Sequence, residues 1–165
     1  MSTVLFVCTG NTCRSPMAAA LFQAYARRAG RDDIHAESAG LAALVGSPAT
    51  EEARRTAADV ASLEGHRARQ IDDALVARAD LVVAVTREHA RRLRACFPDA
   101  ADRIIATADL PGGADVSDPY LLSQKAYDRT RRSLERVFPA LLAELDHHVA
   151  RAERIRGEGE GKSKP

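Results

Sequence analysis

The stretch Leu5-Phe-Val-Cys-Thr-Gly-Asn-Thr-Cys-Arg-Ser-Pro-Met17 joins an apolar run to a short polar loop and then to the start of a helix. The run from Thr3 to Val7 is typical of a strand buried on both faces, as in a parallel sheet. Pro16 favours the first turn of a helix, where its missing N–H group costs nothing. The stretch therefore predicts a strand–loop–helix unit in which the positive end of the helix points at the loop.

The loop between Cys8 and Arg14 has the composition of a phosphate cradle. Its backbone N–H groups can surround a tetrahedral anion because the intervening side chains are small: Thr9, Gly10, Asn11, Thr12 and Cys13. Arg14 can bind two phosphoryl oxygens at once, and its charge and the helix terminus favour an ionised Cys8. We interpret Cys8 as a nucleophile. A buried structural cysteine beside a surface arginine is the weaker alternative, given the strand before the loop and the helix after it.

Further apolar runs predict strands over Ile34–Ser38, before a turn at Ala39-Gly40, and over Leu81–Val85 and Arg103–Thr107. Apolar periodicity and capping residues predict helices over 15–29, from Ser47-Pro48 to Leu63, over 86–94 and over 125–153, with Pro139 as a candidate kink. The alternation predicts an α/β fold: an open four-stranded parallel sheet with helices on both faces and an N-terminal phosphate-binding loop. Ligands of such sheets bind at the carboxyl ends of the strands, where Cys8 lies.

The length of 165 residues predicts a single domain over residues 1–156, followed by a polar, disordered tail over residues 157–165. The net charge of +1 gives no reason to expect a nucleic-acid partner. Neither a leader pattern nor a run long enough to span a bilayer is visible, so we expect no membrane partner and a cytoplasmic location. We also expect a monomer.

The three cysteines argue against a disulfide scaffold, and the histidine spacings do not suit a zinc site, so no metal or cofactor is expected. Cys13 has two open interpretations: a small filler of the loop, or a resolving thiol that captures oxidised Cys8 as a reversible disulfide. Cys96, close to a predicted helix end, is expected to be a small buried hydrophobic side chain.

The pattern C-x5-R-[ST] near the N-terminus resembles the signature of the low-molecular-weight protein tyrosine phosphatase family, and Asp118-Pro119-Tyr120 resembles a second element of that family. The resemblance extends from Val4 to about Val149. The loop is still more similar to bacterial protein-arginine phosphatases, because Thr12 stands where tyrosine phosphatases usually carry Ile or Leu. The resemblance also implies that Ser38 and His66 support the loop and favours the redox interpretation of Cys13. A turn serine and a surface histidine are the plain alternatives.

Expulsion of a leaving group from phosphorus needs a proton donor, and Asp118 is the candidate. Its alternative is an Asp-Pro turn opener. Together, Cys8 and Asp118 predict an in-line attack by Cys8 to form a phosphocysteine, followed by attack of water with Asp118 as base. Ser15 can donate a hydrogen bond to the sulfur, and Tyr120 can form one wall of the entrance.

The predicted function is that of a cysteine-dependent protein phosphatase acting on phosphoarginine, because the Thr12 hydroxyl offers an acceptor to a guanidinium N–H group. Loop variation without consequence is the alternative for Thr12, and a protein tyrosine phosphatase is the alternative function. Arsenate reduction is disfavoured because that chemistry relays electrons through two downstream cysteines and only Cys96 is present. A phosphate-binding module without turnover is disfavoured by the complete set of Cys8, Arg14 and Asp118.

Overall fold

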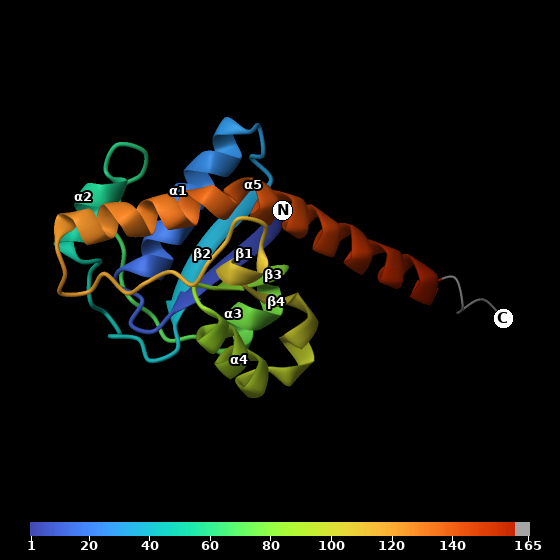
Figure 1. Ribbon diagram of the computed structural model, residues 1–165. Helices are drawn as coiled ribbons and strands as arrows, with labels where there is room; N and C mark the ends of the chain where they lie inside the picture. The colour runs from blue at the N-terminus through green and yellow to red at the C-terminus, as the bar shows by residue number, and fades with distance from the viewer. Residues whose placement is uncertain (161–165) are drawn as a thin grey trace.

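The computed structural model describes residues 1–160, and its centre is a sheet of four parallel strands (Figure 1). The strands are β1 (Ser2–Cys8), β2 (Ile34–Gly40), β3 (Leu81–Ala84) and β4 (Ile104–Ala106), in the order β2-β1-β3-β4. Helices cover both faces of the sheet, so the predicted α/β fold is confirmed. Among the helices of residues 1–160, none carries an apolar stretch that could span a lipid bilayer.

Side chains of β1 alternate between two layers of the core. Val4 and Phe6 pack towards α1 (Arg14–Arg28) and α5 (Gln124–Glu160), whereas Leu5 and Val7 pack towards α3 (Asp73–Arg78) and α4 (Arg87–Cys96). Every residue of β1 from Val4 to Cys8 is buried, as expected for a central parallel strand.

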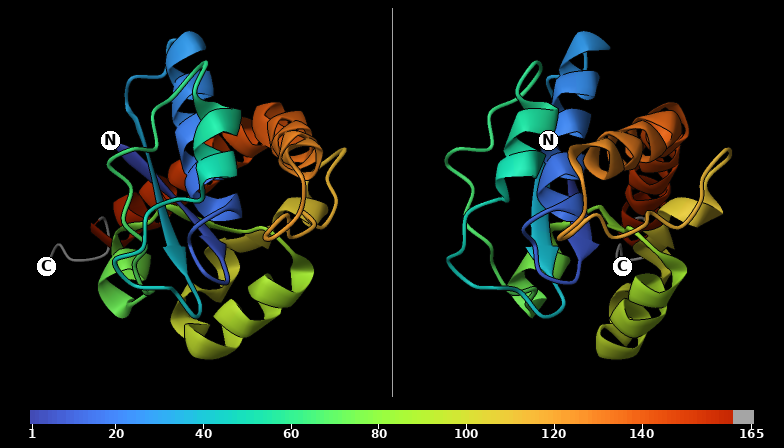
Figure 2. Two further views of the ribbon diagram at one scale, coloured as in Figure 1. Left: turned by 90° about the vertical axis from the view of Figure 1, so that its left-hand side faces the viewer. Right: turned by 60° about the vertical axis from the view of Figure 1, so that its left-hand side comes forward.

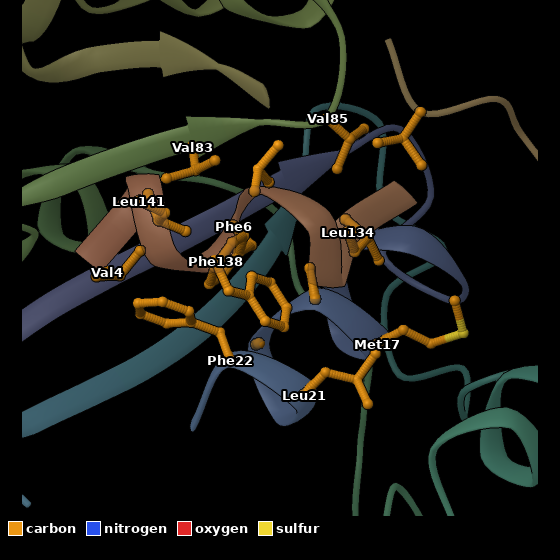
Figure 3. Packing of buried hydrophobic residues seen from close by; sticks show 14 of the residues in the cluster. Val4, Phe6, Met17, Leu21, Phe22, Val83, Val85, Leu134, Phe138 and Leu141 are labelled. Atoms are coloured by element: carbon orange, nitrogen blue, oxygen red, sulfur yellow. The ribbon is translucent and has the colours of Figure 1, made fainter. Parts of the chain in front are cut away.

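In the layer between the sheet and helices α1 and α5, the rings of Phe6, Phe22 and Phe138 pack together among aliphatic side chains (Figure 3). The ring of Phe22 on α1 lies edge-on to Phe6 at a centroid distance of 5.6 Å and to Phe138 on α5 at 5.3 Å. These contacts hold α1 firmly on the sheet. They thereby fix the direction in which its N-terminus points.

The carboxyl ends of β1 and β2 meet at Cys8 and Gly40, which are paired in the register of the sheet. A Cβ atom at Gly40 would lie 2.4 Å from the Thr9 carbonyl oxygen, so this close approach requires glycine. The turn predicted at Ala39-Gly40 is wrong, because β2 continues through both residues. The chain after β2 then runs beside the loop after β1 at one end of the sheet (Figure 2).

Helix α2 spans only Glu51–Ala57, so the prediction of a helix from Ser47-Pro48 to Leu63 is wrong at both ends. Residues 47–50, predicted to be the first turn, are held outside the helix: the Ser47 carbonyl accepts the Ala68 N–H group, and the Thr50 N–H group donates to the Thr12 carbonyl. The Thr50 hydroxyl then caps α2 by accepting the Ala53 N–H group.

Helix α3 was not predicted, although Asp72 caps it by accepting the Leu75 N–H group at 2.8 Å. Cys96 is exposed, so its predicted burial is wrong. It is the last residue of α4 and lies beyond the buried side chains Ala90 and Leu93. Short 3-10 helices at Pro98–Arg103 and Thr107–Asp109 flank β4.

Helix α5 continues to Glu160, so residues 157–160 are helical rather than part of a disordered tail. A helix anchored by packing gains one backbone hydrogen bond for each residue that it adds, which explains the extension. The rest of the predicted tail, residues 161–165, lies outside the described residues. Pro139 is inside α5, and the helix changes direction along its course (Figure 1).

Candidate active site

The carbonyl oxygens of the loop after β1 all accept hydrogen bonds from groups around the loop. The pairs are Cys8 with Leu41 N, Thr9 with Ala42 N, Gly10 with Leu44 N, Asn11 with His66 Nε2, Thr12 with Thr50 N and Cys13 with Met17 N, at 2.7–3.2 Å. Within the described residues, none of the N–H groups of residues 9–14 donates to a protein acceptor. These N–H groups are therefore available to an anion, as in other backbone anion sites.

Asn11 holds the loop in its shape. Its φ of 58° lies in the left-handed region, which asparagine tolerates better than most residues. Its side-chain Nδ2 donates to Ser15 Oγ at 2.9 Å and to Ser38 Oγ at 3.0 Å, while its Oδ1 accepts the Arg69 N–H group at 2.9 Å. The structure thus places the predicted support residue Ser38 directly against the loop.

His66, the other predicted support residue, contacts the Asn11 carbonyl oxygen at 2.7 Å through Nε2. A carbonyl oxygen can only accept, so Nε2 carries the hydrogen of this bond. Burial lowers the pKa of His66, which favours the neutral ring at neutral pH. A neutral ring with its hydrogen on Nε2 satisfies this contact.

Cys8 and Ser15 are brought together at the floor of the loop. Cys8 Sγ lies 3.0 Å from Ser15 Oγ, and both side chains are buried. Because Ser15 Oγ accepts from Asn11, its own hydrogen is free to be donated to the Cys8 sulfur or to the Ala39 carbonyl oxygen 3.3 Å away. A donor to the sulfur and the N-terminus of α1 both stabilise a thiolate.

Arg14 and Asp118 meet at the wall of a cavity of about 190 Å³. Arg14 is only 6% exposed; one nitrogen donates to the Val116 carbonyl at 3.1 Å, and another lies 3.4 Å from Asp118 Oδ2. Asp118 Oδ1 accepts the Tyr120 N–H group at 3.1 Å, which orients the carboxylate. The cavity is lined by Cys8, Thr9, Gly10, Thr12, Cys13, Arg14, Ala42, Leu44, Asp118 and Tyr120. Ala42 and Leu44 were not predicted.

Cys13 lines the same cavity as Cys8, and both are free thiols. Cys13 Sγ lies 3.3 Å from the hydroxyl of Tyr127, which accepts a hydrogen bond from Thr50 at 3.1 Å. Burial raises the pKa of the Tyr127 hydroxyl, so the hydroxyl stays protonated and can donate to Cys13. The disulfide between Cys8 and Cys13 stays a prediction.

The family model described as low molecular weight phosphotyrosine protein phosphatase matches residues 3–151. The chain belongs to this family. It is therefore a protein phosphatase, which confirms the predicted family and enzyme class.

Relatives in the family carry two kinds of name. The low molecular weight protein-tyrosine-phosphatase Wzb of Escherichia coli K12 is 36% identical over 136 residues, which cover 82% of this chain and 89% of Wzb. The protein-arginine-phosphatase of Bacillus subtilis 168 is 35% identical over 144 residues, which cover 86% of this chain and 95% of the relative.

A solved structure of the arginine phosphatase YwlE, in which a serine replacing the active-site cysteine is phosphorylated, has a TM-score of 0.80. Its sequence is 34% identical, and the match covers 87% of this chain and 95% of that one.

His89 is a further residue at this site that sequence reasoning missed. His89 is 8% exposed, and its Nε2 lies 2.8 Å from the hydroxyl of Thr9 in the loop. Its Nδ1 lies 2.6 Å from the hydroxyl of Thr86, the residue that caps α4. The spacing of Thr86 and His89 fits a helix start, but no local pattern connects His89 to Thr9.

The environment of His89 predicts a pH dependence of stability. Burial first, and then the positive charges of Arg14 and Arg92, lower its pKa from 6.5 to about 4, against the opposing effects of Asp118 and Glu88. The unfolded chain therefore binds more protons than the folded one between these values. Folding stability contributed by the neutral ring is complete above pH 6.5 and is lost as the pH falls towards 4.

We expect this contribution to be about 1–3 kcal/mol, which chemical unfolding of the wild type and of His89→Phe between pH 4 and pH 7 can measure. Phenylalanine has no imidazole that could be protonated, so the free energy of unfolding of the variant should fall less steeply as the pH is lowered. Parallel pH curves for the two proteins would contradict the prediction.

Proposed function

We propose that the chain is a cysteine-dependent phosphatase that removes phosphate from phosphoarginine in proteins through a phosphocysteine at Cys8. One observation carries the proposal: Cys8 lines a cavity whose loop N–H groups donate to no acceptor among residues 1–160 and whose wall holds Arg14 and Asp118 3.4 Å apart. This arrangement supplies a nucleophile, anion donors and a carboxyl group around one point.

In the first step, the Cys8 thiolate attacks phosphorus in line with the leaving group. The bond from phosphorus to the guanidinium nitrogen breaks as Asp118 gives its proton to that nitrogen. The loop N–H groups and Arg14 bind the phosphoryl oxygens throughout. The phosphorylated active-site serine of the YwlE structure supports an intermediate at this position.

In the second step, water attacks the phosphorus of phosphocysteine while Asp118 takes a proton from it. The sulfur–phosphorus bond breaks, and Cys8 leaves as a thiolate. Its departure is favoured by Ser15, which lies 3.0 Å from the sulfur. Inorganic phosphate is the product, and both side chains return to their initial protonation states.

The arginine assignment is supported by the acceptors that line the cavity. A guanidinium group only donates hydrogen bonds, and the hydroxyl of Thr12 and the carbonyl oxygen of the Asp118 carboxyl group can accept them. Phosphotyrosine is the second candidate substrate, because the side chains of Leu44 and Tyr120 offer apolar surface to a phenyl ring. A comparison of kcat/KM for phosphoarginine and phosphotyrosine in peptides of one sequence decides between them.

Thr12→Ile should reverse the preference between these substrates. Thr12 is 6% exposed and lines the cavity, so the change removes an acceptor and adds apolar surface. A hydrogen bond to a charged partner contributes roughly 1.5–3 kcal/mol. We therefore expect kcat/KM to fall about tenfold or more for phosphoarginine and to rise for phosphotyrosine.

Thr12→Ser is the matched control for this change, since it keeps the hydroxyl and should retain the preference of the wild type. If Thr12→Ile lowered kcat/KM equally for both substrates, the change would have distorted the loop, and Thr12 would not select the substrate. If neither value changed, phosphotyrosine would become the better assignment.

A further inference from the structure

A chain of hydrogen-bonding groups connects the first residue of the loop to the start of α4. Thr9 Oγ1 lies 2.8 Å from His89 Nε2, and His89 Nδ1 lies 2.6 Å from Thr86 Oγ1. The backbone N–H group of His89 also donates to Thr86 Oγ1 at 3.2 Å, so Thr86 holds the residue at two points. Thr86 thus fixes the position of the His89 ring independently of the contact with Thr9.

His89 is buried and does not line the cavity, whereas Thr9 is exposed and lines it. A neutral imidazole has one donor and one acceptor nitrogen, and a hydroxyl can do either, so both neutral tautomers satisfy this chain. A hydroxyl oxygen has two lone pairs, of which His89 engages at most one. In either tautomer, Thr9 Oγ1 therefore keeps a lone pair that His89 does not use.

We propose that His89 is a positioning residue that fixes the Thr9 hydroxyl as a second acceptor, beside Thr12, for the N–H groups of a phosphorylated guanidinium. The proposal rests on the proposed function. Without the ring of His89, the Thr9 side chain would be free to turn about its Cα–Cβ bond, and the acceptor would lose its fixed position. A phenyl leaving group has no N–H group, so it does not use this acceptor.

The test measures the ratio of kcat/KM for a phosphoarginine peptide to that for a phosphotyrosine peptide of the same sequence. Thr9→Val removes the hydroxyl at nearly constant volume and should lower the ratio about fivefold to tenfold. His89→Phe removes the ring nitrogens and should lower it about threefold or more. The double variant should match Thr9→Val within about twofold, because His89 acts through the Thr9 hydroxyl.

His147→Phe, an exposed substitution on α5, is the matched control and should leave the ratio unchanged. An unchanged ratio in Thr9→Val or in His89→Phe would overturn the inference, since both residues would then only support the loop. Losses that multiply in the double variant would show that His89 does not act through Thr9.

The ratio also separates this inference from the proposed function. A wild-type preference for phosphotyrosine would contradict the proposed function. The changes in the ratio caused by Thr9→Val and His89→Phe test the roles of Thr9 and His89, whatever ratio the wild type has. If His89→Phe failed to fold, ¹⁵N NMR of the ring would provide the test: Thr9→Val should shift the Nε2 resonance of His89. A constant Nε2 resonance would overturn the contact.

Discussion

Cys8→Ser will stop steady-state turnover, with a loss of about 10⁴-fold or more in kcat. A serine hydroxyl is not ionised at neutral pH, so it attacks phosphorus far more slowly than a thiolate. Phosphate binding should persist, because the loop N–H groups and Arg14 do not depend on the sulfur. Steady-state kinetics and calorimetric titration with inorganic phosphate measure the two expectations separately.

Cys96→Ser is the control for this substitution, because Cys96 is exposed at the end of α4 and does not line the cavity. It should keep the activity of the wild type. A single transfer of phosphate to the new serine is compatible with the prediction, as the phosphorylated serine of the YwlE structure illustrates. Sustained turnover by Cys8→Ser would mean that another group is the nucleophile.

Asp118→Asn should lower kcat by about 10²- to 10³-fold for substrates with poor leaving groups, such as phenyl phosphate. The amide cannot give a proton to the departing atom. For an activated ester such as nitrophenyl phosphate the loss should be much smaller, because its leaving group needs little protonation. The side chain of Asp118 is 55% exposed and 3.4 Å from Arg14, so the substitution leaves the core unchanged.

The matched control is Asp115→Asn, in the same segment of chain. Asp115 accepts the Arg87 N–H group at 2.8 Å and does not line the cavity, so its loss should change both substrates little. Equal losses on phenyl and nitrophenyl phosphate in Asp118→Asn would remove Asp118 from the role of acid.

The sequence was sufficient for the parts of the fold that local physics decides. The buried run before Cys8 predicts β1, and Pro16 predicts the start of the helix after the loop, within two residues of the observed ends. The predicted start of α2 was wrong because Ser47 and Thr50 use their backbone groups in contacts with distant segments. Such contacts leave no trace in local periodicity.

The candidate site likewise contains residues that a local motif predicts and residues that only the fold brings together. Cys8 and Arg14 belong to one short motif, so their proximity follows from the loop itself. Asp118 was placed opposite them through the family resemblance and the need for an acid. His89 approaches Thr9 only because β3, which precedes α4, lies next to β1 in the sheet. The order of the strands, rather than any residue pattern, brings it there.

The main-chain hydrogen bonds between the segment after β2 and the loop after β1 have an evolutionary consequence. Leu41, Ala42 and Leu44 bind the loop through their main-chain N–H groups, which every amino acid except proline possesses. The side chain at position 44 also lines the cavity. Mutation can therefore remodel this wall of the binding pocket while the main-chain ties stay in place. Substitutions at position 44 can therefore change the substrate preference of a phosphatase while its catalytic loop keeps its shape.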